Sequence, residues 1–237
     1  TIAALFIMLF SMGEKAHAQQ DAAYSMYMFN GLALNPAYAG SRDALAITAL
    51  YRHQWTGFEG APSTGVISAH APLMQGSMGL GGSIAYDRLG VSDIITANLD
   101  YAYIIRFKDK NNSRLSLGIN ATINNFRARW TELSVQDGGD PGFQANSPSV
   151  TNPNFGFGVY YYSDRWYAGA SIPTLLNTSF NDGLQLEGTQ QVARKWRHMF
   201  FTAGVVIGKE DAAVKFKPSV LFKYVDNAPF IADINAS

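Results

Sequence analysis

Cysteine is absent from this 237-residue chain, and charged residues make up only 15% of it. Without thiols the chain forms no disulfides and no thiolate metal sites. Basic and acidic residues number 18 each, so no net charge attracts nucleic acid or an anionic surface. After residue 18 there is no apolar run long enough for a transmembrane helix. Any crossing of a membrane must therefore be made by strands.

Catalytic motifs are missing as well. His53, His70 and His198 have no serine motif such as G-x-S-x-G nearby, and there is no Walker loop. Asp137 and Asp140 lie in a Gly-rich stretch whose spacing matches no full Ca²⁺ loop. We therefore predict a protein that is not an enzyme, with no catalytic residues, no cofactor and no bound metal.

What the chain does contain is a repeated alternation of apolar and mostly polar residues. Between residues 94 and 106 the odd positions are apolar or aromatic and the even positions are mixed. The apolar positions of three such segments are Ile95, Ala97, Leu99, Tyr101, Tyr103 and Ile105; Met78, Leu80, Ile84 and Tyr86; and Leu115, Leu117, Ile119, Ala121 and Ile123. Period two is typical of transmembrane β-strands, although a soluble β-sandwich alternates too.

Aromatic residues favour the membrane interpretation. They reach 13% of the chain, and many fall near the ends of predicted strands, as an interfacial girdle requires. The candidates are Tyr101, Tyr103, Phe107, Trp166, Tyr167, Trp196 and Tyr224. Gly79-Leu80-Gly81-Gly82 lies inside a predicted strand, where small residues ease close packing or bending.

The first 18 residues resemble a secretory signal peptide. An apolar stretch from Ile2 to Met12 precedes Ala16-His17-Ala18, which fits an A-x-A cleavage site. We expect cleavage after Ala18 and, because an initiator methionine and a basic start are missing, a few further residues before Thr1. Export combined with a barrel indicates a bacterial outer membrane.

We predict strands at 43–52, 63–73, 77–88, 93–107, 113–126, 154–163, 165–172, 195–208, 214–225 and from 229 onward. The connections near residues 75, 89 and 109–113 are short, whereas those at 127–153 and 174–194 are long and polar. Short turns at one rim and long loops at the other are typical of outer-membrane barrels. The last strand stops at Ser237, so we expect further carboxy-terminal strands to close the barrel. Residues 43–237 are thus predicted to form an incomplete, antiparallel, all-β transmembrane barrel.

Residues 19–42 are predicted to form an irregular periplasmic lead-in or plug. Pro36 has no amide donor and biases Asn35 toward an extended conformation, while Gly40 permits a positive φ. With its aromatic residues, this segment either packs inside the lumen or docks a partner, or it merely covers the barrel opening.

Several motifs stand out along the chain. They are Tyr27-Met28-Phe29-Asn30, Leu34-Asn35-Pro36-Ala37-Tyr38-Ala39-Gly40-Ser41, Tyr51-Arg52-His53-Gln54-Trp55-Thr56-Gly57-Phe58, Asp87-Arg88-Leu89-Gly90-Val91 and Pro153-Asn154-Phe155-Gly156. Together these motifs resemble the PorP/SprF family of Bacteroidetes outer-membrane proteins. The Asn35-to-Gly40 block joined to the Arg-x-Gln-Trp stretch is the most specific part.

The resemblance implies a β-barrel component of the type IX secretion system, linked to protein export, adhesin delivery and gliding motility. It also implies association with the periplasmic ring lipoprotein and its partner proteins, with secreted cargo or a surface adhesin, and with outer-membrane lipid. No catalytic or cargo residue comes with the family. Our candidate partner-binding residues are Tyr27, Phe29, Asn35, Pro36, Tyr38, Arg52 and Trp55. The competing hypothesis is a general, porin-like diffusion channel, which requires an open, charged lumen.

Overall fold

One antiparallel sheet accounts for most of the described chain. The computed structural model describes residues 27–109, 111–132, 146, 149–179, 194–195, 197–208, 215–226 and 229–236. Over these residues the sheet has ten strands: β1 (Ala46–His53), β2 (Ser63–Leu73), β3 (Met78–Leu89), β4 (Ser92–Arg106), β5 (Arg114–Ala128), β6 (Val150–Tyr162), β7 (Trp166–Ile172), β10 (His198–Val205), β11 (Pro218–Val225) and β12 (Ile231–Ala236). Neighbours in the sheet follow this order, and each neighbouring pair of these described strands is antiparallel. The predicted all-β antiparallel class is confirmed.

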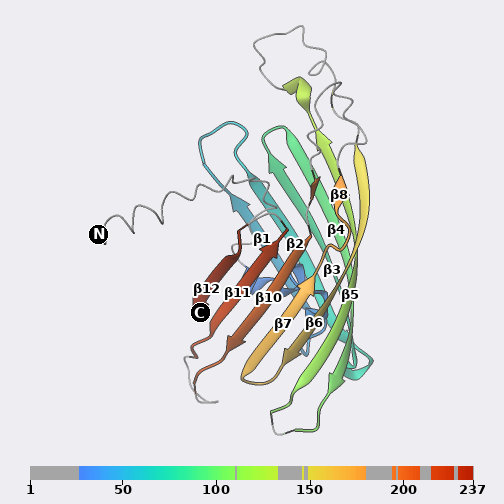
Figure 1. Cartoon of the computed structure of the whole chain (residues 1–237), viewed down its shortest axis with the longest axis vertical. Coiled ribbons are helices and arrows are strands. Elements are labelled where there is room, and N and C mark those ends of the chain that lie inside the picture. The colour runs from blue at the N-terminus through green and yellow to red at the C-terminus, as the bar shows by residue number, and fades with distance from the viewer. Residues whose placement is uncertain are drawn as a thin grey trace, which may run out of the picture.

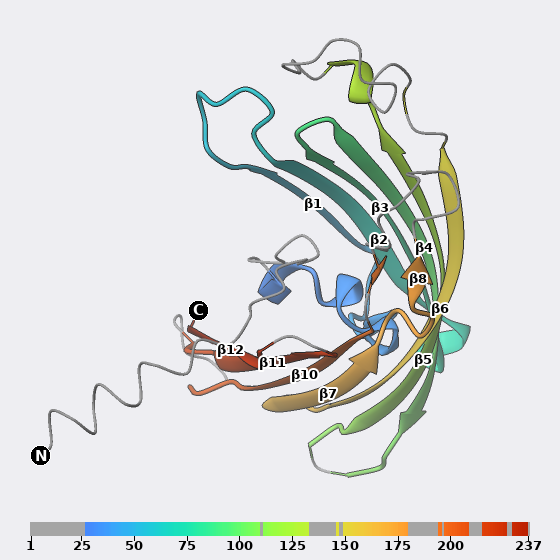
Figure 2. The same cartoon turned by 45° about the horizontal axis from the view of Figure 1, so that its top comes forward.

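The sheet curls into a deep trough (Figures 1 and 2). β1 and β12 form its two edges, so the described strands do not close into a ring. A separate pair, β8 (Thr178–Ser179) and β9 (Arg194–Lys195), lies in the connection between β7 and β10. No helix in the described ranges has the length and apolar character needed to cross a bilayer.

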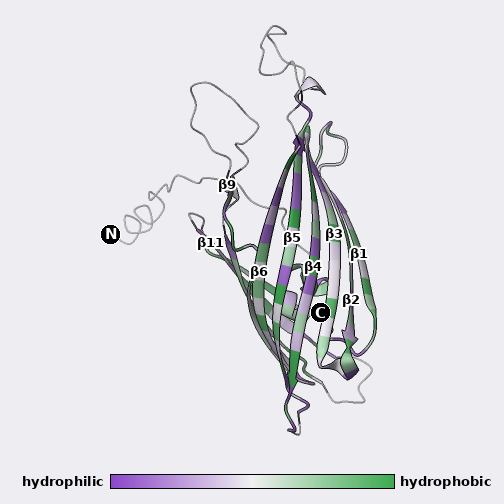
Figure 3. Cartoon of the chain, turned by 90° about the vertical axis from the view of Figure 1, so that its right-hand side faces the viewer, coloured by the Kyte–Doolittle hydropathy of each residue, from purple (hydrophilic) through white to green (hydrophobic). Residues whose placement is uncertain are grey.

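The two faces of the sheet have opposite chemistry. On the convex face Leu99 and Ile119 are each 61% exposed, whereas on the concave face Asp100 is 2% exposed and Ser116 is fully buried. Figure 3 shows hydrophilic and hydrophobic positions alternating along β3 to β6. This arrangement confirms the period-two prediction, and it is the reverse of a soluble protein because apolar side chains point outward.

Some details differ from the predicted strands. β6 begins at Val150, so Pro153 lies within the strand. At Pro153 β6 pairs with β5 on one side only, because its pairing with β7 starts at Phe157. A strand with one free side tolerates a residue that has no N–H to donate. The predicted strand 195–208 is shorter, at His198–Val205. Trp196, one of the predicted girdle aromatics, lies outside the described residues.

One girdle aromatic is on the other face. Tyr167 packs against the ring of Tyr160 on the concave side, with ring centroids 5.8 Å apart. Because Trp166 precedes it on the same strand, only one of the two can face outward, and Trp166 stacks on Tyr161 at 4.7 Å. The expectation that both belong to the girdle was wrong for Tyr167.

The connections divide between two rims. The short-turn rim carries the connections β2–β3, which contains η4 (Met74–Gly76), β4–β5, β6–β7 and β10–β11. The opposite rim carries the longer β5–β6 connection, with η5 (Trp130–Glu132), and the β7–β10 connection. The short turn at residues 90–91 also belongs to this long-loop rim, because it joins β3 to β4, so short and long connections are not fully separated.

Candidate functional site

Residues 27–41, here called the inner segment, lie on the concave face of the sheet (Figure 2). The segment consists of three 3-10 turns, η1 (Tyr27–Phe29), η2 (Gly31–Ala33) and η3 (Pro36–Tyr38). Asn35 is extended, Pro36 opens η3, and the Asn35 side-chain oxygen accepts a hydrogen bond from Ala37 N at 2.9 Å. The local Asn-Pro chemistry therefore makes the turn that η3 presents to β4, β5 and β6.

Side-chain hydrogen bonds join the inner segment to β6 and β7. The Asn35 amide Nδ2 donates to Val159 O at 3.0 Å and to Ala170 O at 3.4 Å. Ser171 Oγ donates to Leu34 O at 2.6 Å. One amide and one hydroxyl thus donate hydrogen bonds to three backbone carbonyls, two in the strands and one in the inner segment.

The other side of the trough contributes similar contacts. His70 Nδ1 on β2 accepts a hydrogen bond from Gly40 N at 3.1 Å, and Ser68 Oγ donates to the Asn30 side chain at 3.1 Å. The Tyr38 ring packs edge-on to the His70 ring at 5.3 Å. Gly40 has the positive φ predicted for it, +69°. The inner segment is therefore held from both walls of the trough.

Glycines in the strands make room for the inner segment. A Cβ at Gly118 of β5 would overlap the backbone of Ala37, and a Cβ at Gly79 of β3 would overlap that of Ala39. Gly158 of β6 is in the same position beneath the Asn35 side chain. The prediction that Gly79 eases close packing is confirmed, and the sheet approaches the inner segment as closely as two backbones can.

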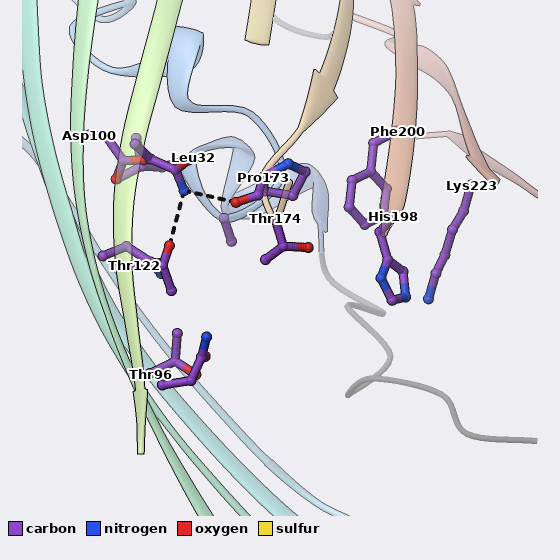
Figure 4. A pocket seen from close by; sticks show the side chains of 13 residues that line it. Leu32, Thr96, Asp100, Thr122, Pro173, Thr174, His198, Phe200 and Lys223 are labelled. Atoms are coloured by element: carbon purple, nitrogen blue, oxygen red, sulfur yellow. Dashed lines mark hydrogen bonds between the residues drawn. The ribbon is translucent and has the colours of Figure 1, made fainter. Parts of the chain in front are cut away.

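A ladder of amides and hydroxyls lines β4 and β5 beside the inner segment. Thr122 Oγ1 donates to Asn98 Oδ1 at 2.6 Å, and Asn120 Nδ2 donates to Thr122 Oγ1 at 3.2 Å and Pro173 O at 3.3 Å (Figure 4). These bonds fix the strand register on a face with few apolar contacts, since each polar group satisfies another.

The ladder borders a recess of about 60 Å³, which is large enough to hold water. Asp100 lies on one side of the recess, and His198 and Lys223 lie together on the other (Figure 4). Asp100 Oδ2 and Asn120 Oδ1 are buried without a hydrogen-bond partner among the described residues. The recess therefore suits a small hydrogen-bond donor or a cation. Within the described ranges, no three His, Asp or Glu side chains gather as metal ligands would.

The structure separates the predicted partner-binding residues into two groups. Asn35 and Pro36 are buried and Tyr38 is partly buried, so these three side chains contact the sheet. Phe29 is 57% exposed and Trp55, in the β1–β2 loop, is 68% exposed. Arg52 lies on β1 near the long-loop rim, and the Tyr27 side chain lies outside the described residues.

Sequence reasoning missed the residues that receive the inner segment. His70 was considered as a catalytic group and interpreted as a solvated or structural histidine, without its contact to the inner segment, and Ser171, Gly118 and Gly158 were not singled out. A usable signal was present, because both glycines occupy positions that the alternation assigns to the concave face. The residues of a strand do not reveal which distant segment packs against its glycines, because that contact forms only in the tertiary structure.

Comparison with known proteins identifies one matching protein family. The family model described as type IX secretion system membrane protein PorP/SprF matches residues 16–237. No curated protein and no solved structure matches the chain.

Proposed function

Since this chain belongs to the PorP/SprF family of type IX secretion system membrane proteins, we propose that it is a non-enzymatic outer-membrane component that supports export or surface anchoring of cargo. Gliding adhesins are one cargo class that fits this role. The proposed partners are the periplasmic ring lipoprotein with its associated secretion proteins, the cargo, and outer-membrane lipid. Residues 1–18 are proposed to be a cleaved signal and residues 19–42 a lead-in to the barrel.

The convex face supports the membrane location. Its outward-pointing aliphatic and aromatic side chains suit lipid and not water. In lipid the unpaired backbone groups of the edge strands β1 and β12 are costly, so we propose that further pairing closes the sheet into a barrel. Short turns are periplasmic in outer-membrane barrels, which orients the short-turn rim toward the periplasm.

The occupied concave face is the observation that favours this function over a diffusion channel. A channel needs a continuous aqueous path, yet the inner segment covers the concave surface of β3, β5 and β6 so closely that glycines are required beneath it. Asn35, Pro36 and Tyr38 then support partner binding by position, because they hold the segment in place. Phe29, Arg52 and Trp55 are the candidates for direct contact.

Affinity purification tests the proposal. The tagged protein is solubilised from outer membranes in mild detergent, and co-purified proteins are identified by mass spectrometry. We expect type IX ring proteins or a large surface protein, and we expect the surface proteome of a deletion strain to lack specific exported proteins. A purified protein without such companions that conducts ions in planar bilayers, from a strain with an unchanged surface proteome, would overturn the proposal in favour of the channel.

A further inference from the structure

Positive charge is concentrated at the short-turn rim, although the chain as a whole is neutral. Among the described residues of the rim connections and adjoining strand ends, seven are basic and three are acidic. The basic residues are Arg42, Arg106, Lys108, Arg114, Arg165, Lys215 and Lys217, and the acidic ones are Asp43, Asp109 and Asp164. The rim therefore presents a local excess of cations.

Three of these cations face the inside of the trough. Arg106 shares the concave side of β4 with the buried Ala102 and Ile104. The Arg114 guanidinium lies 5.7 Å from the centre of the Tyr162 ring, and Lys217 Nζ lies 5.0 Å from that of Tyr167. Arg106, Arg114 and Lys217, with the rings of Tyr162 and Tyr167, are here called the basic mouth. Cations over aromatic rings have their positions restricted without being neutralised.

The nearby carboxylates leave most of this charge uncompensated. Asp43 pairs with Arg114 at 2.9 Å. Asp109 accepts hydrogen bonds from the Ser113 amide at 2.8 Å and hydroxyl at 2.6 Å, so it caps its own turn. Within the part of the chain that the structure describes, Arg106 and Lys217 form no ion pair.

The β2–β3 turn positions Arg106. Gly76 has φ +80°, and a Cβ there would overlap the Arg106 guanidinium. The guanidinium therefore rests on the turn backbone at the rim. Guanidinium groups bind carboxylates with two parallel hydrogen bonds, which gives this position a defined ligand chemistry.

We propose that the basic mouth binds an acidic segment of a partner polypeptide that enters the concave side from the short-turn rim. A polypeptide fits better than lipid headgroups, because lipid meets the convex face while these cations point inward. The identification of the partner as a periplasmic protein rests on the proposed function, whereas the charge chemistry does not.

A binding assay with a defined probe tests the inference. The purified protein in lipid nanodiscs is titrated into a fluorescently labelled peptide of ten glutamates, with a ten-glutamine peptide as the probe control. We expect only the acidic peptide to bind. Its Kd is expected to rise about tenfold between 50 and 500 mM salt, because salt screens the interaction between exposed charges. The double variant R106Q/K217Q is expected to weaken binding about tenfold at low salt, in line with the loss of exposed charge pairs.

Arg127→Gln provides the matched control, because Arg127 is an exposed arginine at the opposite rim. We expect it to bind the acidic peptide as the wild type does. Folding of each variant is checked by its heat-dependent mobility on gels, and the single variant Lys217→Gln replaces the double variant if the latter misfolds. Equal binding by wild type and mouth variants, or mouth-dependent binding of phosphatidylglycerol vesicles without peptide binding, would overturn the inference. Since no secretion readout is involved, that outcome leaves the proposed function intact.

Discussion

Asn35 shows how much one side chain contributes to the position of the inner segment. Its oxygen completes the turn at Ala37, while its amide hydrogens reach carbonyls on two different strands. An amide is the only side-chain group of this size that both accepts and donates in this way. The Asn-Pro pair was predicted to break regular structure, and its backbone effect was readable from sequence. The strand carbonyls that it reaches were not, because they lie more than 120 residues away.

Substitution of Asn35 by aspartate tests this role. The shape is kept, but the donor is replaced by a carboxylate oxygen facing the Val159 carbonyl, so the Val159 and Ala170 carbonyls lose a bond. We expect a loss of about 1–3 kcal/mol in the free energy of unfolding, because the new carboxylate oxygen is buried without a donor. Urea titration of the detergent-refolded protein measures it. Asn111→Asp, at an exposed turn, is the control, and an equal effect of both variants would contradict the assignment.

Gly118 offers a second test at the same scale. Alanine there forces its Cβ into the Ala37 backbone, and overpacking of this kind costs about 1–3 kcal/mol or displaces the inner segment. Gly65→Ala is the matched control, since its Cβ would meet only the Tyr51 ring at 3.7 Å, an ordinary contact. The readout is the urea midpoint together with protease cleavage within residues 27–41. Similar midpoints and cleavage rates for both variants would show that the glycine contact is dispensable.

The Asp109 carboxyl makes the stability of the β4–β5 turn depend on pH. Hydrogen bonds from the Ser113 hydroxyl and amide lower the pKa of the Asp109 carboxyl below its ordinary value. A lowered folded-state pKa adds stability above the unfolded-state value of 3.8 and loses it as pH falls through the folded value. We expect Ser113→Ala to raise this pKa toward 3.8 and to reduce the acid sensitivity contributed by the turn. Stability measured between pH 2 and 6 checks this, and an unchanged acid profile would count against it.

At the scale of single elements, the strands were the most predictable part. β4 and β5 alternate over fifteen residues each, so both faces followed from the pattern, and the predicted bounds 93–107 and 113–126 lie within two residues of the observed ones. The pattern failed where chemistry changes within a strand, as at the start of β6 with Pro153, or where a strand is only two residues long, as in β8 and β9. Periodicity carries no information over so few residues.

Depth in the membrane gives a test of the convex face. Leu99 lies at the middle of β4, and Phe107 lies just beyond its end, both exposed. Lysine at a bilayer midplane costs about 2–4 kcal/mol in a transmembrane barrel and about 0–1 kcal/mol near the interface. We therefore expect Leu99→Lys to impair folding into lipid vesicles far more than Phe107→Lys. Equal folding yields for both variants would contradict the membrane-spanning orientation of β4.

At the scale of the whole molecule, the trough and its inner segment form one unit. The class of sheet and the outward apolar face were predicted, while the closeness of segment and sheet was not, because it depends on residues of β2, β3, β5, β6 and β7 acting together. No single stretch of sequence predicts this close contact, because it forms only when strands far apart in the sequence pair with one another.

Deletion of residues 27–40 tests this unit. Removing them leaves Gly79, Gly118 and Gly158 uncovered and deprives the Ser171 hydroxyl of its acceptor. We expect a less stable sheet and, from the proposed function, loss of cargo from the cell surface, measured by heat-dependent gel mobility and surface proteomics. A normally folded protein with intact export would remove any functional role for the inner segment.

The long sequence separation of the inner segment's contacts also sets an order of events during biogenesis. The Leu34 carbonyl accepts its hydrogen bond from Ser171, 137 positions later, so the inner segment reaches this contact only after β7 has been made. Contacts of such high order form slowly, and until β7 arrives the early residues remain available to chaperones. Docking of the inner segment onto β7 therefore follows the pairing of the earlier strands during assembly.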